Sequence, residues 1–340
     1  MHRDSWQCYM VTFSVILFLV IVAIYISLTN GTFDMTVMDI IRTVFRINPV
    51  PEHDLVIFDF RLPRIVIAAL VGFGLGVAGA AIQGVTRNGL ADPGILGINA
   101  GAGAAIVVFM FFFQGQIKST DWFSIMLLPL FGLAGGLGSA ILIYIFSWKG
   151  GRLDSQRLLL TGIAIGYGLS SFSVYLSLKM KATDFEMAAV WVSGSIYNAN
   201  WKYIIAMLPW LIILVPMIQR KAYLLDMFQL EETSIKSLGI SVEKEKSILL
   251  LSGIGIVSAC VSVSGSIGFV GLMAPHIAKR LVGIHHNQVI PICGVIGMLL
   301  VIVSDFIAKT VFTPIELPVG IVISIIGVPY FLYLLFKAKA

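Results

Sequence analysis

Long apolar segments separated by short polar ones dominate this chain. A bilayer core about 30 Å thick needs roughly 20 helical residues for each crossing, and charged residues gather in the intervals between the apolar runs. The pattern therefore predicts an all-α, polytopic membrane protein with about ten transmembrane helices. The expected spans are residues 9–28, 64–83, 95–113, 122–147, 157–178, 203–218, 248–264, 266–283, 289–308 and 318–336.

Composition agrees with a membrane protein and excludes some functions. Hydrophobic residues make up 58% of the chain and charged residues 12%, about half of the roughly 25% found in soluble domains. The net charge of +5 is spread over the loops, whereas a nucleic-acid-binding protein would gather it in a basic patch. Cys8, Cys260 and Cys293 lie far apart, which favours apolar packing over a disulfide framework or a metal site.

The loops also predict an orientation. An even number of spans places both termini on the same side, and 14 of the 23 Lys and Arg residues fall on that side. By the positive-inside rule, both termini are expected in the cytoplasm. The first span lacks a small-x-small cleavage pattern at its end, so it is expected to be retained. Residues 1–340 are predicted to form one transmembrane domain, with residues 219–247 as a cytoplasmic loop within it.

The most specific segment is residues 264–283, SGSIGFVGLMAPHIAKRLVG. Its first three glycines recur at intervals of three, so a helix here would carry a stripe without side chains against which other backbones could pack closely. Pro275 is expected to end or kink that helix, and a basic cluster follows it. The positions of interest are Gly265, Gly268, Phe269, Gly271, Pro275, His276 and Arg280.

This string resembles the GxIGFVGLxxPHxxRxxxG signature of the FecCD-type permeases, which are membrane subunits of ATP-driven importers for iron-siderophore complexes, haem and cobalamin. The resemblance covers about residues 60–336. It implies ten helices per subunit, a functional dimer with a second permease subunit (homodimer or heterodimer), a cytoplasmic ABC ATPase subunit and an extracytoplasmic substrate-binding protein. It implies no cofactor. The expected cargo is an iron-siderophore complex, with cobalamin or haem as the alternative.

Three basic residues on the expected external side run against the positive-inside rule. Arg61 and Arg64 lie in an RLPR motif, and arginines near a helix end commonly extend to lipid headgroups. The resemblance implies instead that they face the binding protein, where a guanidinium can pair with a carboxylate through two hydrogen bonds. Lys309 stands where the family has arginine, so it keeps the charge but loses the planar fork.

Residues 219–247 are too polar to cross lipid. Glu231 and Glu232 could pair with Lys236 on a short helix, and Gly239 could end that helix. A solvated loop would show the same features, but the segment resembles the family's ATPase-coupling element. The residues assigned to coupling are Glu231, Glu232, Lys236, Leu238 and Gly239.

Glycines also mark two further spans. Gly162 and Gly166 form a small-residue face in the span 157–178, which in the family helps to wall the central pathway. Pro318 and Gly320 match the family pattern at the start of the last span. Close helix packing would equally explain these residues. Gly72 and Gly76 in the second span form a small-xxx-small pair, which indicates helix packing. The GxGxxG match at Gly74, Gly76 and Gly79 lies inside this apolar span and lacks the strand-turn context that a dinucleotide site requires.

Several features of other functional classes are missing from the sequence. The chain has no GxxxxGK[ST] motif, so ATP hydrolysis is expected in a separate subunit. Its acidic residues fall near span ends or in loops, whereas ion-coupled secondary transporters usually place them within the membrane. No catalytic set is found, and the pair His285-His286 is expected to be solvated. The chain is therefore interpreted as a permease and not an enzyme, with an ATP-independent transporter or a membrane scaffold as less favoured alternatives.

Overall fold

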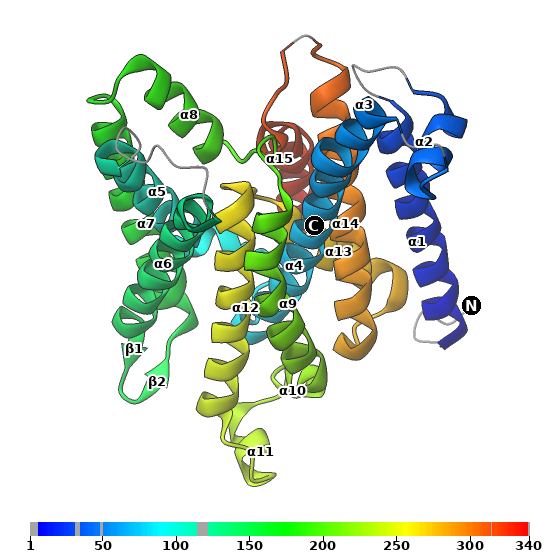
Figure 1. Cartoon of the computed structure of the whole chain (residues 1–340). Helices are drawn as coiled ribbons and strands as arrows, with labels where there is room; N and C mark the ends of the chain where they lie inside the picture. The colour runs from blue at the N-terminus through cyan, green and yellow to red at the C-terminus, as the bar shows by residue number, and fades with distance from the viewer. Residues whose placement is uncertain (1–5, 31–34, 48–49, 114–121, 314, 339–340) are drawn as a thin grey trace.

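The protein is a bundle of long helices whose connections gather at two opposite ends (Figure 1). The computed structural model describes residues 6–30, 35–47, 50–113, 122–313 and 315–338. One end carries α2, α3, α8 and the connection between α14 and α15, and the other carries a small hairpin, α10 and α11 (Figure 1). The start of α1 lies toward the second end.

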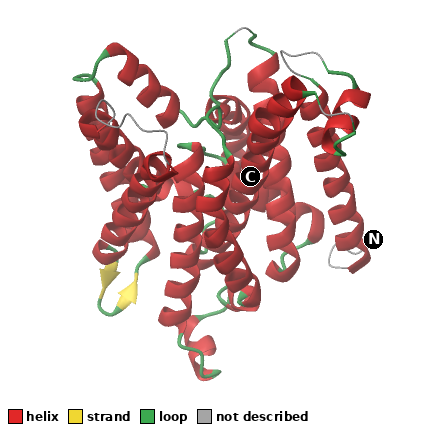
Figure 2. Cartoon of the chain, in the orientation of Figure 1, coloured by secondary structure: helices red, strands yellow, loops and turns green. Residues whose placement is uncertain are grey.

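Helices account for almost all of the described structure (Figure 2). The only strands among the described residues are β1 (Trp148–Lys149) and β2 (Arg152–Leu153), which pair antiparallel. In chain order the helices are α1 (Trp6–Thr29), α2 (Val37–Val44), α3 (Pro51–Asp54), the π-helical η1 (Leu55–Arg61), α4 (Leu62–Thr86), the 3₁₀ helix η2 (Pro93–Leu96), α5 (Ile98–Phe113), α6 (Trp122–Phe146), α7 (Ser155–Ser177), α8 (Ala182–Val192), α9 (Trp201–Arg220), α10 (Ala222–Met227), α11 (Glu232–Ser237), α12 (Val242–Ser264), α13 (Val270–Val282), α14 (His286–Thr310) and α15 (Val319–Ala338).

The predicted polytopic helical fold is confirmed, although the spans differ in length. Eight helices in the described chain are long and apolar enough to cross a membrane. The other two expected spans are shorter: α5 has 16 residues because η2 takes the place of its predicted first turn, and α13 has 13. The protein is therefore a multi-pass membrane protein in which two of the ten expected spans are shortened helices, each preceded by a segment that is not α-helical.

The centre of the bundle is α4, which packs against α12, α13 and α14. Its glycines allow this closeness, as the sequence predicted for Gly72 and Gly76. A Cβ at Gly72 would overlap the backbone carbonyl of Gly297, and one at Gly76 would overlap that of Cys293, both on α14. The glycine face therefore brings two helix backbones into direct contact.

Candidate functional site

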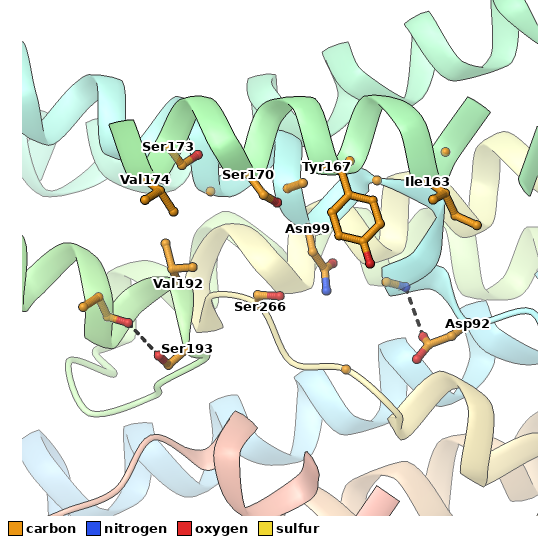
Figure 3. Close-up of a pocket in the computed structure, with 18 of the residues that line it drawn as sticks. Asp92, Asn99, Ile163, Tyr167, Ser170, Ser173, Val174, Val192, Ser193 and Ser266 are labelled. Carbon is orange, nitrogen blue, oxygen red and sulfur yellow. Dashed lines mark hydrogen bonds between the residues drawn. The ribbon is translucent and has the colours of Figure 1, made fainter. Parts of the chain in front are cut away.

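A cavity of about 900 Å³ lies among α5, α7, α8 and the connection between α12 and α13 (Figure 3). Its lining is mostly apolar, with hydroxyl and amide groups interspersed. The side chains of Asn99 on α5 and Tyr167 on α7 point into it from these two neighbouring helices (Figure 3). Among the described residues of the lining, Asp92 is the only charged one. The site is therefore a weakly polar chamber, and the described part of its lining holds no cluster of metal-ligating side chains.

One face of α7 forms a wall of the cavity. Gly162 and Gly166 line it, as does a series of serines farther along the same helix: Ser170, Ser173 and Ser177. Residues separated by three, four or multiples of a turn share one helix face. The sequence prediction stopped at the two glycines and missed the serines, although the same spacing continues through them. The structure shows features of both interpretations of Gly162 and Gly166: they line the cavity, and they also pack against Gly97, whose Cβ would lie 2.9 Å from Gly162 O and 3.4 Å from Gly166 N.

The signature segment is not helical where it meets the cavity. Residues 265–268 have no regular structure, Gly265 has φ +67° and Phe269 has φ +63°. A Cβ at Gly265 would also overlap the backbone carbonyl of Trp191. The predicted helical stripe through Gly265 and Gly268 is therefore wrong: a positive φ at Gly265 ends α12, and a new helix starts only after Phe269. Gly268 and Phe269 instead line the cavity.

Asp92 ties this irregular segment to the loop between α4 and α5. One carboxylate oxygen accepts a hydrogen bond from Gly94 N at 3.0 Å, and the other accepts one from Phe269 N at 2.9 Å. A carboxylate at the N-terminus of α13 also interacts favourably with the helix dipole. The Asp92 side chain thus connects two segments that lie 177 positions apart in the sequence. The sequence analysis did not predict this role for Asp92.

Gly271, Pro275, His276 and Arg280 lie outside the cavity lining and pack the bundle. Gly271 faces Pro93, and Pro275 is buried inside α13. His276 makes an edge-to-face contact with Tyr330 at 5.7 Å between ring centroids, and the Arg280 guanidinium lies 6.0 Å from the Tyr333 ring. Both aromatic partners belong to α15, so this half of the signature joins α13 to the last helix.

The start of α15 packs behind the cavity wall. Pro318 immediately precedes the helix, and Gly320 N donates a hydrogen bond to Gly194 O at 2.9 Å. A Cβ at Gly320 would overlap the carbonyl of Ser193 and crowd that of Ser266, two cavity residues. Gly320 therefore serves close packing directly behind the wall.

All three cations assigned to docking are engaged within the chain. Arg61 donates to Leu28 O, and Lys309 Nζ donates to Ser27 O at 3.0 Å and Ser27 Oγ at 2.9 Å. These contacts attach the ends of α4 and α14 to the end of α1. These partners could not be predicted from the sequence, because they lie 33 and 282 positions away.

Arg64 is the most buried of the three. Its Nε lies 2.9 and 3.1 Å from the two carboxylate oxygens of Asp305, and its Nη1 lies 2.8 Å from Glu316. Only 14% of the Arg64 side chain is exposed. The structure brings Arg61, Arg64 and Lys309 to the same end of the bundle, but as members of an internal network.

The residues assigned to ATPase coupling lie at the opposite end, around α11. Glu232 forms an ion pair with Lys246 of α12, a partner that the predicted pairing with Lys236 did not include. Gly239 has φ +79° directly after α11, so the predicted helix end is confirmed. Glu231, Lys236 and Leu238 are exposed, which leaves them accessible to a partner.

The two histidines behind this surface differ from one another. His285 is exposed as expected, but only 3% of the His286 side chain is exposed, so the prediction of a solvated pair is wrong for His286. Its backbone N–H donates to Asp226 Oδ1 at 3.0 Å, and its ring Nδ1 contacts the same oxygen. Burial acts to raise the pKa of Asp226, but these hydrogen bonds outweigh it and hold that pKa below the usual carboxyl value. The pair joins α10 to α14.

Known proteins resemble this chain along nearly its whole length. It is 55% identical over 321 residues to the iron-uptake system permease protein FeuC of Bacillus subtilis (strain 168), an alignment covering 94% of this chain and 96% of that one. It is 44% identical over 330 residues to the iron(3+)-hydroxamate import system permease protein FhuG of the same organism, covering 97% and 98%.

A solved structure and a family model agree with these relatives. The solved structure is a metal-chelate type ABC transporter in an inward-facing conformation, with a TM-score of 0.81 and 27% identity over 96% of this chain and 98% of that one. The family model describes the FecCD transport family and matches residues 19–337. This chain belongs to the FecCD transport family.

Proposed function

We propose that this protein is the permease subunit of an ATP-binding-cassette importer that carries an iron-siderophore complex across the bacterial cytoplasmic membrane. Membership of the FecCD transport family supports the class, and the names of FeuC and FhuG support iron as the cargo. The permease guides the chelate and performs no chemistry on it.

The observation that carries this proposal is the weakly polar cavity beside an unwound segment. Irregular backbone within a membrane protein is tolerated where it lines a cavity or is buried in protein, and residues 265–269 meet that condition. We assign this cavity to one half of the translocation pathway. Exposed apolar side chains on α7 and directly after it, including Leu160, Tyr167 and Leu178, leave a surface that a second permease subunit would cover.

An ABC ATPase subunit would bind the end that carries α10 and α11, which we place in the cytoplasm together with both chain termini. Apolar side chains project there: Tyr223 is 49% exposed, Leu230 53% and Leu238 64%. Next to them lies the polar group of Glu231 and Lys236. ATP binding would move this surface, and the ion pair between Glu232 and Lys246 and the contact between Asp226 and His286 would pass the movement to α12 and α14.

A substrate-binding protein would dock at the opposite end, near Arg61, Arg64 and Lys309. It would deliver the chelate to the cavity from outside the membrane. Because ATP hydrolysis would supply the free energy, no ion-coupling residue is needed within the spans.

The test is uptake of radiolabelled iron by a strain lacking this gene, offered a panel of ferric chelates with labelled cobalamin and haem alongside. Loss of one ferric chelate, restored by the intact gene, is the expected result. Loss of cobalamin or haem alone would keep the importer class and replace the cargo. Full uptake in membrane vesicles depleted of ATP would contradict the importer class, because a secondary transporter needs no ATPase.

A further inference from the structure

The internal ion pairs of Arg64 differ in how firmly they hold. Asp305 lies within α14 with 2% of its side chain exposed, and it contacts both Nε and Nη2 of Arg64. A buried carboxylate is very unfavourable without its partner. Glu316 lies in the connection before α15 with 32% of its side chain exposed, and it contacts only Nη1. An ion pair so accessible to water contributes little stability.

This asymmetry divides the guanidinium into a fixed part and an exchangeable part. Asp305 holds Nε and Nη2 and so orients Arg64 between α4 and α14. Nη1 is bound by a side chain that water, or another carboxylate, can reach. Arg61 and Lys309 lie close enough to make the surroundings favourable for an anion, because they carry positive charge beside the two acids.

We propose that Glu316 is an internal substitute for a carboxylate of the substrate-binding protein, and that docking exchanges one for the other on Arg64. This inference rests on the proposed function. Asp305 is the positioning residue that keeps Arg64 in place during the exchange. Docking then requires Glu316 to leave, so the resting permease competes with its own partner.

The exchange at Arg64 can affect the cavity through the start of α15. Glu316 precedes Gly320 by four positions, and Gly320 packs on the backbone of Ser193 and Ser266 in and behind the cavity wall. Release of Glu316 removes the ion pair that holds the connection between α14 and α15 against α4. The start of α15 thereby loses one of its attachments when the binding protein arrives, while the hydrogen bonds from Leu317 N to Ala308 O and from Gly320 N to Gly194 O remain.

The experiment measures the affinity of the permease–ATPase complex, in lipid nanodiscs, for the binding protein that restores chelate uptake with this permease. Glu316→Gln removes the competitor and should tighten binding by about two- to fivefold, the size expected for an exposed ion pair. Glu52→Gln is the matched control, because Glu52 is exposed on α3 at the same end and its loss changes the long-range charge equally. It should leave the affinity unchanged.

Two further variants make the result specific. In an Arg64→Gln background, Glu316→Gln should have no effect, because the site for which it competes is gone. Asp305→Asn should weaken docking even when thermal unfolding shows a folded complex. Equal effects of Glu316→Gln and Glu52→Gln, or weaker binding by Glu316→Gln, would overturn the exchange. Failure of the unchanged complex to bind any such protein would instead overturn the proposed function.

Discussion

Helices α4 and α7 carry similar glycine patterns but have different surroundings. In the most apolar stretch of the helix that contains α4, 83% of the residues are buried, against 22% for α7. A Cβ at Gly72 would overlap the backbone of α14, whereas one at Gly168 would meet no atom within 4 Å. The same small-residue signal therefore marks a packing surface along α4, whereas in α7 it marks a close approach to Gly97 at Gly162 and Gly166 and an open surface at Gly168. Sequence spacing predicts that a face is small, but not what lies against it.

The largest expected effect comes from filling the packed face. Gly72→Ala or Gly76→Ala should lower the free energy of unfolding by about 1–3 kcal/mol, the usual range for overpacking, because backbone on α14 must shift to accommodate the methyl group. Thermal unfolding of the purified permease in detergent, with the yield of folded protein, measures this. An unchanged midpoint in both variants would contradict the tight contact between α4 and α14.

The second test fills the cavity face of α7 instead. Ser170→Trp should remove most chelate uptake while leaving thermal unfolding unchanged, because Ser170 lines the cavity and supports no packed helix. Phe172→Trp is the control on the same helix, since Phe172 is exposed but lies outside the cavity lining. If both variants transport normally, this cavity is not on the pathway.

A third test addresses Asp92, which connects the loop after α4 to the turn before α13. Asp92→Asn puts an amide N–H₂ against one of two backbone N–H groups, so one hydrogen bond is lost and a buried donor is left unpaired. The expected cost is about 1–3 kcal/mol, accompanied by reduced uptake. Asp59→Asn, at an exposed position, should change neither. Wild-type stability and uptake for Asp92→Asn would mean that other contacts hold the Phe269 turn.

These contrasts show which features of the structure could be predicted from the sequence. Apolar run length predicted the helices, and the spacing of Gly72 and Gly76 predicted their packing, because both signals are local. The unwinding at Gly265 was missed because Gly265 packs there against the backbone carbonyl of Trp191, which lies far away in the sequence. Partners of Arg64 were missed for the same reason: Asp305 and Glu316 follow it by 241 and 252 positions.

The site residues also differ in whether local sequence patterns could predict them. Gly162 and Gly166 were identified from spacing, and the serines of α7 could have been found by extending that spacing. Asp92 could not, since its role depends on the backbone N–H of Phe269, which the sequence offers no way to place. Burial of His286 likewise depends on α10 folding back against α14. Local patterns thus predicted the elements, and long-range contacts decided their roles.

The smallest expected effect sharpens the comparison most. Gly168→Ala adds a methyl group where the single chain has open space, and alanine is favoured over glycine in a helix interior by about 1 kcal/mol. The isolated subunit should therefore be slightly stabilised, as thermal unfolding can measure. In the complete importer, the same methyl group meets either lipid or the second permease subunit. A stabilised complex would place this face toward lipid or open space, whereas a complex that dissociates more readily would show a second backbone packed there, as α14 packs on α4.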